Sequence, residues 1–474
     1  MVILNVVVPP IIIGAIILSF IGLFLYQRDV RKNGTKSQEQ KPFKETEELP
    51  AEFIGARVLK KEAGIRYVGV KYSRHQQDFT IVFLTDRGEE LPLPVPKEVF
   101  LRCEEQQTGT LVTVGGNFFS FDEGEEVWDP VADLPHSITV FVEGTGSHLQ
   151  GIALDEKREY LYCSFTTCFM KMDLKGNPVA SVKGLAGHLG CIAYNRQDGK
   201  IYGSLEFKHD QIGKDILEKI GYTGEIKDGF YIVAFDPEKM TRMEMDAEQD
   251  GVMTAVFLQE VYEDYTAEGH RYGCSGIDGV TFAPAMGEGD GKEYLYVAYG
   301  IYGDTTRTDN DYQVLLQYDI TNWEQYAKPL LQAEMHRSGP EYPEAKYFVY
   351  TGNTRYGIQN LEYDAYTHSM LAAVYKGEKE QFANHSMFFI YCGEEPRLCN
   401  LKGIFEEGET LPLAEFSRGD SGMGGSDFLH GATGLIALGD GYYYISEGFK
   451  QEKGYGGHIR LYQLDAENVD FKEV

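Results

Sequence analysis

Two histidines recur at matching places in a diffuse internal repeat of this chain. Five segments share a small-residue turn that leads into an apolar strand, and they begin at His148, His188, Gly276, Gly357 and Gly431. When the segments are aligned on their small and apolar residues, His148 and His188 fall at the same position. Two residues later the repeats carry polar side chains, namely Gln150, Asp278, Gln359 and Thr433.

Three more candidates lie close to these positions. His430 stands one place before the histidine position, and Glu206 and Glu447 end the second strands of their repeats. Histidines with carboxylates can hold a divalent metal or act as general acid and base. The alternative is that these side chains only hydrogen-bond channel water and cap strand ends. The sequence singles out no catalytic residue or metal ligand, and it predicts no cofactor.

The repeat also predicts the elements that position these residues. A second strand follows each turn, as at 160–164 and 442–446, and a third strand ends in a polar turn, as at 230–236. Strand–turn–strand units at irregular spacing are typical of a β-propeller, whose blades converge on one axis. We therefore expect an all-β chain with a propeller over residues 136–474. Five blades are favoured and a sixth is possible within 240–272, while a β-sandwich is the alternative.

Two segments outside the repeat have predicted roles in this ring. Residues 137–142 read Ser-Ile-Thr-Val-Phe-Val and lie before the first repeat, so they are expected to add the outer strand to the last blade. Residues 208–228 carry apolar side chains on one helical face and predict a short amphipathic helix that covers the ring.

Other motifs are incomplete. The acidic run 304–311 lacks the glycine and the distal glutamate of an EF-hand loop. The glycine-rich run 421–426 lacks the Lys-Ser/Thr of a phosphate-binding loop. Neither a Gly-x-Ser-x-Gly elbow nor a His-Glu-x-x-His helix is present.

The amino terminus predicts a membrane anchor. Residues 2–26 are almost entirely apolar, which is enough helix to cross a bilayer core, and Arg28, Arg31, Lys32 and Lys36 follow directly. A cleaved signal peptide is the alternative, but the run is long for one and no small-x-small cleavage site follows it. We expect a transmembrane helix at 1–27 and a polar tether at 28–51. The basic cluster predicts a single-pass protein of the cell membrane with its bulk on the cytoplasmic side.

Residues 52–125 predict a small β-domain of six short strands. This part resembles the bacterial membrane-protein family called domain of unknown function 2500. The resemblance rests on Ala56-Arg57-Val58, the aromatic strand 79–83, the acidic turn 86–89, Leu93-Pro94-Val95-Pro96 and Gly109-Thr110-Leu111. The chain departs from the family at 104–109, where it reads Glu-Glu-Gln-Gln-Thr-Gly in place of an acidic Glu-Gly-Asp turn. The resemblance implies a membrane protein and no known chemistry.

Composition limits the partners. Hydrophobic residues make up 43% of the chain, so packed cores are expected despite a net charge of −29. That charge disfavours nucleic acid as a partner. Seven cysteines without a Cys-x-x-Cys pair predict free, buried thiols.

Two classes of function remain. The first is a membrane-anchored binding or scaffolding module that recognises a protein, a peptide or a glycan. The second is a hydrolase or lyase that uses the His148–His188 pair, with or without a divalent metal.

Overall fold

The computed structural model describes residues 51–68, 74–85, 88, 90–114, 116–122, 131–144, 147–288, 291–417 and 424–474. The predicted membrane span and nearly all of the predicted tether, residues 1–50, lie outside these described residues. Within the described part of the chain, no helix combines the length and the apolar character needed to cross a bilayer. Strands dominate over helices there, which confirms the predicted all-β class.

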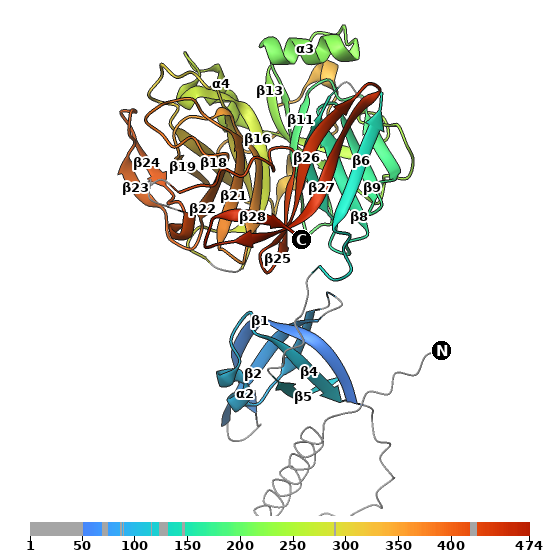
Figure 1. Cartoon of the computed structure of the whole chain (residues 1–474), viewed down its shortest axis with the longest axis vertical. Helices are drawn as coiled ribbons and strands as arrows, with labels where there is room; N and C mark the ends of the chain where they lie inside the picture. The colour runs from blue at the N-terminus through green and yellow to red at the C-terminus, as the bar shows by residue number, and fades with distance from the viewer. Residues whose placement is uncertain are drawn as a thin grey trace, which may run out of the picture.

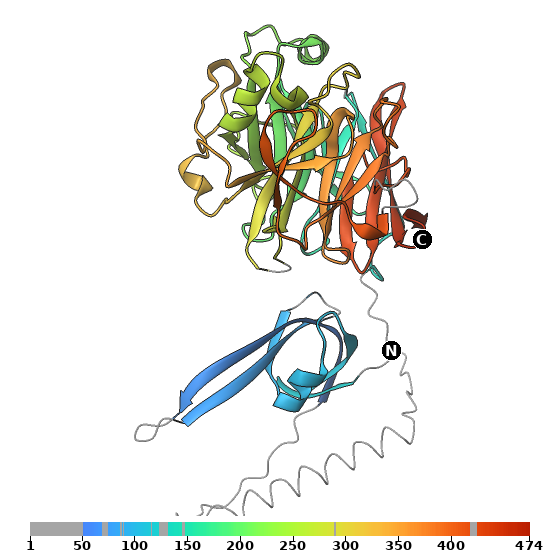
Figure 2. The same ribbon diagram turned by 90° about the vertical axis from the view of Figure 1, so that its left-hand side faces the viewer.

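The first sheet is antiparallel with the order β3-β2-β1-β4-β5. Its elements are β1 (Ala51–Val68), β2 (Arg74–Thr85), β3 (Glu90–Pro94), the short helix α2 (Lys97–Arg102), β4 (Thr108–Val114) and β5 (Asn117–Asp122). Figure 2 shows β1 and β2 running on together as a long ribbon beyond the other strands. Strand β1 contains the first of the six predicted strands and the start of the second. The described residues of this part therefore form five strands rather than six. A β-bulge between Val58 and Lys60 bends this long strand.

Five further sheets stand around a common axis (Figure 1). In each of them the strands follow one another outward in chain order, with later or earlier segments added at the outer edge. We call them blades one to five. Blade one contains β7 (Leu149–Leu154), β8 (Tyr160–Phe165), β9 (Cys168–Asp173), β10 (Pro178–Lys183) and β14 (Met245–Asp246). Blade two contains β11 (His188–Tyr194), β12 (Ile201–Phe207), β13 (Gly229–Phe235) and β15 (Met253–Phe257).

The remaining blades follow the same plan. Blade three contains β16 (Cys274–Pro284), β17 (Glu293–Ile301), β18 (Tyr312–Tyr318), β19 (Ala345–Tyr350), β24 (Glu407–Thr410) and β23 (Arg397–Asn400). Blade four contains β20 (Arg355–Asp364), β21 (Ser369–Tyr375) and β22 (Met387–Tyr391). Blade five contains β25 (Leu435–Gly439), β26 (Tyr442–Gln451), β27 (Gly454–Asp465), β28 (Asp470–Glu473) and β6 (Ser137–Glu143).

The blades close into a ring. The inner strands β7, β11, β16, β20 and β25 each contact the next, and β25 contacts β7. A separate hydrophobic core fills each of the five interfaces between neighbouring blades. A propeller-like ring of five sheets is therefore observed, and the β-sandwich alternative is wrong.

The possible sixth blade at 240–272 is not found there. β15 completes blade two as its outer strand, and the residues after it form helix α4 (Gln259–Thr266). The strand-like pattern of 253–261 therefore marks one outer strand and the start of a helix whose Val261 is buried.

Strand β6 closes the ring as the sequence predicts. It pairs antiparallel with β27, from Ser137 opposite Arg460 to Glu143 opposite Gly454. Its Ile138 and Val140 are buried in the core between blades five and one. The segment before the first repeat thus completes the last blade.

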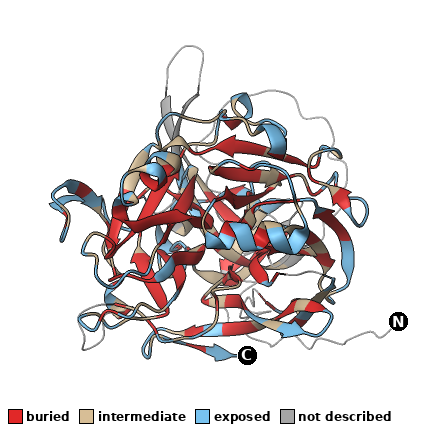
Figure 3. Cartoon of the chain, turned by 90° about the horizontal axis from the view of Figure 1, so that it is seen from above, coloured by how far each residue is buried: buried red, intermediate tan, exposed pale blue. Residues whose placement is uncertain are grey.

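Helix α3 (Gln211–Ile220) leaves blade two and lies at one end of the ring (Figures 1 and 3). The Asp210 side chain caps it by accepting a hydrogen bond from the Gly213 amide at 2.9 Å. Ile216 is buried, whereas Ile212 and Ile220 are 37% and 40% exposed. The predicted amphipathic helix is confirmed, and part of its apolar face stays open.

Candidate functional site

Four inner strands carry a break in register at the residues that the repeat alignment singles out. Pairing shifts between Leu149 and Gly151 in β7, and between Leu189 and Ile192 in β11. It shifts again within 277–280 of β16 and within 358–360 of β20. β-Bulges re-aim side chains, and they are frequent beside functional sites. Here the breaks lie at or beside Gln150, Asp278 and Gln359, which the repeat alignment singles out.

His188 lies at the centre of this polar cluster. Its Nδ1 atom is 3.5 Å from Asp278 Oδ1 and 3.8 Å from Glu206 Oε1. Gln359 donates from Nε2 to the other carboxyl oxygen of Asp278 at 3.1 Å. Blades two, three and four therefore meet at one point, as the alignment of the repeat predicts.

Glu206 is fixed by its neighbours. Its Oε1 is 2.5 Å from the Lys208 ammonium, and its Oε2 accepts the Ile277 amide at 2.9 Å. Lys208 also donates to the Ser275 carbonyl at 2.9 Å, and its Nζ lies 3.8 Å from Asp210. The Glu206 carboxylate is thus already compensated by the Lys208 ammonium. Among the described residues no group of three or more histidine, cysteine or acidic side chains is arranged to hold a metal.

Close packing at Gly276 makes this arrangement possible. A Cβ at Gly276 would lie 1.8 Å from Glu206 Oε2, and the residue has a φ of +131°. Only glycine accepts both that backbone conformation and that close approach. The lack of a side chain at Gly276, the turn glycine of the third repeat, therefore lets the Glu206 carboxylate pack against its backbone.

Burial decides the protonation of the cluster. Burial raises the pKa of Asp278 well above its usual value, and the adjacent Glu206 raises it further. Burial lowers the pKa of His188 to about 3, and Lys208 contributes in the same direction. Burial lowers the pKa of Lys208, but the carboxylates of Glu206 and Asp210 have a larger opposite effect, so the net shift is upward. The Lys208 ammonium thus compensates Glu206, burial favours the protonated form of Asp278, and His188 stays neutral at pH 7.

A carboxylate beside a histidine ordinarily raises the imidazole pKa, but here the pKa of His188 is lowered. The burial that disfavours the imidazolium also favours the neutral form of Asp278, so this carboxyl gives the ring little stabilising charge. The desolvation of the imidazolium therefore dominates.

A cavity of about 800 Å³ opens beside the cluster. His148, Gln150, Thr166 and His188 form part of its polar wall. Its apolar wall comes from helix α3 and from blades one and five, through Val142, Met170, Leu185, Ile212, Ile216, Ile220, Tyr222, Met243 and Tyr455. The two histidines at equivalent repeat positions thus share one cavity.

His148 and Gln150 form a second polar contact in that wall. Gln150 Nε2 lies 3.1 Å from His148 Nε2 and donates to Thr166 Oγ1 at 2.9 Å. Desolvation by the cavity walls lowers the pKa of His148, and the nearby Lys219 lowers it further. His148 is therefore neutral at pH 7, like His188.

Other predicted site residues lie apart from the cluster. Glu447 is exposed on β26 and forms an ion pair with Arg460 at 3.2 Å. His430 packs edge-on against Phe428, with ring centroids 5.4 Å apart. Thr433 Oγ1 is 2.8 Å from Ser446 Oγ within blade five. The contacts described for these three side chains are thus with other residues and not with His188.

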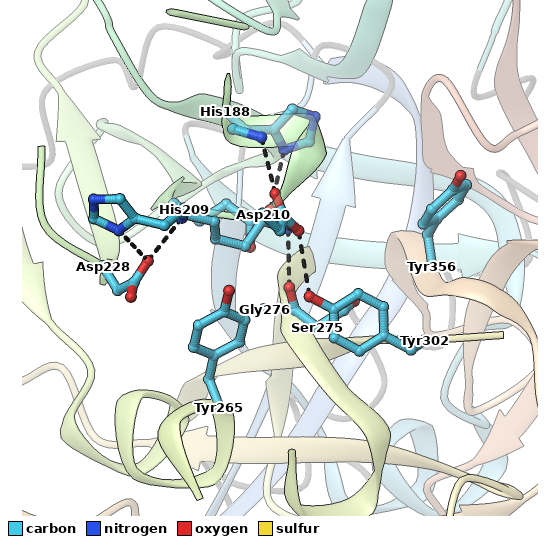
Figure 4. A network of polar contacts seen from close by, with 12 residues as sticks. His188, His209, Asp210, Asp228, Tyr265, Ser275, Gly276, Tyr302 and Tyr356 are labelled. Carbon is cyan, nitrogen blue, oxygen red and sulfur yellow. Dashed lines mark hydrogen bonds and ion pairs between the residues drawn. The ribbon is translucent and has the colours of Figure 1, made fainter. Parts of the chain in front are cut away.

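Several residues of the site are missed by the sequence analysis. Lys208 is the most important, and strand alternation gives the signal for it because it stands two residues after Glu206. Figure 4 shows the surrounding contacts, in which Tyr302 donates to Asp210 at 3.3 Å and His209 pairs with Asp228 at 2.9 Å. Asp210 and Tyr302 come from loops between strands, where no periodicity marks them.

Comparisons with known proteins add little to this geometry. No family model matches the chain, and no curated protein matches it. Solved structures that it resembles include a protein of unknown function from Bacteroides caccae, with 9% identity over 76% of this chain and 99% of that one and a TM-score of 0.26. They also include RRP9 WD40 repeats, with 10% identity over 86% and 99% of the two chains and a TM-score of 0.29. A pyranose dehydrogenase PQQ domain from Coprinopsis cinerea has 11% identity over 87% and 97% and a TM-score of 0.30.

Proposed function

We propose that this chain is a membrane-anchored binding module, and that its propeller takes a ligand into the cavity beside His148 and His188. The observation that carries the proposal is the cavity of about 800 Å³, which is lined by a polar cluster on one side and by an apolar helix face on the other. Ligand pockets of this size typically combine apolar walls with a few placed polar groups. The anchor is the apolar run 2–26, which would hold the cavity near a membrane surface.

The polar wall favours binding over hydrolysis or lyase chemistry. A general base at neutral pH works best with a pKa near 7, whereas the pKa of His188 is about 3. Glu206 is committed to Lys208 and to the Ile277 amide, so it cannot attack a substrate without breaking both contacts. The cluster is arranged to hold hydrogen bonds rather than to exchange protons.

The test is a ligand-observed NMR screen of a defined mixture of small acids, amides, sugars and amines. The protein is the full chain in lipid nanodiscs, and empty nanodiscs provide the blank. Ile212→Trp is the blocking variant, because Ile212 lines the cavity and is 37% exposed, so a larger side chain enters the open space without disturbing a core. Leu331→Trp is the matched control, because Leu331 is 48% exposed and does not line this cavity.

We expect some compounds to bind the unaltered chain and the Leu331→Trp variant, and to lose at least tenfold in affinity for the Ile212→Trp variant. Compounds that bind all three proteins equally, or a mixture from which nothing binds, would overturn the proposal.

A further inference from the structure

His188 and Asp278 each hold one buried polar atom without a hydrogen bond. These atoms are His188 Nδ1 and Asp278 Oδ1, and they face each other at 3.5 Å. A buried polar atom without a partner costs about 1–3 kcal/mol, so the two atoms gain by pairing with each other. The other Asp278 oxygen, Oδ2, already accepts a hydrogen bond from Gln359 Nε2.

Only one proton arrangement satisfies this pair when both groups are neutral. A protonated Asp278 donates from Oδ1, and Nδ1 of the imidazole accepts. A neutral imidazole carries a single proton, which must then sit on Nε2. The raised pKa of Asp278 and the lowered pKa of His188, both due first to burial, agree with this arrangement.

The exposed part of the His188 ring faces the cavity. Nδ1 is fully buried, yet the side chain keeps 14% exposure and lines the cavity, so the exposure belongs to other atoms of the ring. His148 contributes a second donor. An amide nitrogen can only donate, so Gln150 Nε2 makes His148 Nε2 an acceptor and leaves the His148 proton on Nδ1.

We propose that Asp278 is a positioning residue that holds His188 as the Nε2–H tautomer, so that the cavity recognises an acyl ligand: an apolar chain that ends in a carboxylate. The proposal rests on the binding function proposed above and names the chemistry of its ligand. The two imidazole N–H groups donate to the carboxylate oxygens, and Lys219 on α3 supplies a nearby positive charge. The chain of the ligand packs on Ile212, Ile216 and Ile220. A free fatty acid and the carboxyl terminus of an apolar peptide share this chemistry.

The first experiment reads the tautomer without any ligand. The full chain, labelled with ¹⁵N-histidine and held in lipid nanodiscs, is studied by solid-state NMR between pH 5 and pH 8. The His188 signal is assigned as the one that a His188→Asn variant lacks. We expect a neutral Nε2–H ring throughout this range. Asp278→Asn should keep this tautomer, because Gln359 donates to the amide oxygen and the amide nitrogen then donates to Nδ1. Asp278→Leu removes the donor, so the Nδ1–H form should appear, with Glu206 Oε1 as the acceptor near Nδ1. An imidazolium or an Nδ1–H ring in the unaltered chain would overturn the proposal.

The second experiment measures binding of octanoate, of octylamine and of a short peptide that ends in Ile-Leu. Octylamine has the same chain length as octanoate but ends in a donor. We expect octanoate to bind at least tenfold more tightly than octylamine. Asp278→Leu should weaken octanoate binding by about tenfold, which is one hydrogen bond to a charged group, whereas Asp278→Asn should leave it nearly unchanged. Peptide binding at equal or higher affinity than octanoate identifies a protein carboxyl terminus as the source, and weaker peptide binding identifies a fatty acid.

The outcomes separate the two proposals. Octanoate and octylamine that bind equally, and are both blocked by Ile212→Trp, overturn the acyl ligand and leave the cavity as a binding site. Probes that bind the Ile212→Trp variant as well as the unaltered chain overturn the binding function itself.

Discussion

Glu362 joins three blades on the same inner strands that hold the candidate site. It lies on β20, its Oε1 accepts the Ala437 amide of blade five at 2.9 Å, and its Oε2 accepts from Thr281 Oγ1 of blade three at 3.5 Å. Burial raises the pKa of this carboxyl to about 8, and the hydrogen bond from Ala437 opposes the shift only in part. Glu362 is therefore mostly protonated in the folded protein at pH 7.

The raised pKa predicts how stability changes with pH. Between about pH 4.5 and about pH 8, the folded state keeps a proton on Glu362 that the unfolded state has lost, so stability falls as pH rises through this window. We expect Glu362→Gln, which resembles the protonated form, to reduce this slope and to stabilise the protein at pH 9 by roughly 2 kcal/mol, allowing for partial exposure. The measurement is denaturant unfolding at several pH values, with the exposed Glu452→Gln as control. A slope in Glu362→Gln as steep as in the unaltered chain would contradict the assignment.

The sequence could predict part of the site because the repeat places equivalent residues at equivalent points of the ring. His188, Asp278, Gln359 and Glu206 meet as the alignment requires, and His148 and Gln150 line the same cavity as His188. It could not predict the electrostatics. The pKa of His188 depends on how much water the neighbouring blades exclude and on Lys208, and neither is visible in the spacing of the repeat.

Strand β6 shows how one element determines the closure of the ring. Blade five has its inner strands at the end of the chain, and β6 comes from the residues before blade one. It covers the edge of β27 from Gly454 to Arg460, which would otherwise expose unpaired backbone groups. The two ends of the propeller are therefore held together by this ladder and by the core beneath it.

Substitutions on β6 should separate core packing from surface contacts. Val140 is fully buried, so Val140→Ala removes apolar contacts and leaves a small void, which should cost about 2 kcal/mol. Thr139→Ala on the same strand is the control, because Thr139 is exposed and should change stability by less than about 0.5 kcal/mol. Thermal unfolding of both variants is the measurement. Equal effects would show that the ring closes without the core under β6.

Element types could be predicted more reliably than element boundaries. The strands of the five repeats are found because apolar runs and turn glycines mark them. Residues 253–261 contain strand β15 and the start of helix α4. The sequence does not show the boundary between them, because both are largely buried and the apolar pattern therefore has no clear period. The long β1 reads as separate short strands because its bulge between Val58 and Lys60 interrupts the alternation.

All seven cysteines are free thiols, and Cys399 is the one that is exposed. Free buried thiols are usual on the reducing side of a membrane, where disulfides are rare. The basic cluster after residue 26 separately predicts that the propeller faces the cytoplasm.

A reporter at the carboxy terminus tests this topology. Alkaline phosphatase is active only outside the cytoplasm, and green fluorescent protein exported unfolded through the secretion pathway does not fluoresce outside it, so each is fused after Val474 in a bacterial host. Because Arg28, Arg31, Lys32 and Lys36 follow the apolar run while no charged side chain precedes it, we expect a fluorescent and phosphatase-negative cell. Changing these four residues to asparagine should remove the bias and yield a mixed population. Strong phosphatase activity from the unaltered chain would place the cavity outside the cell, and the acyl ligand would then have to be sought there.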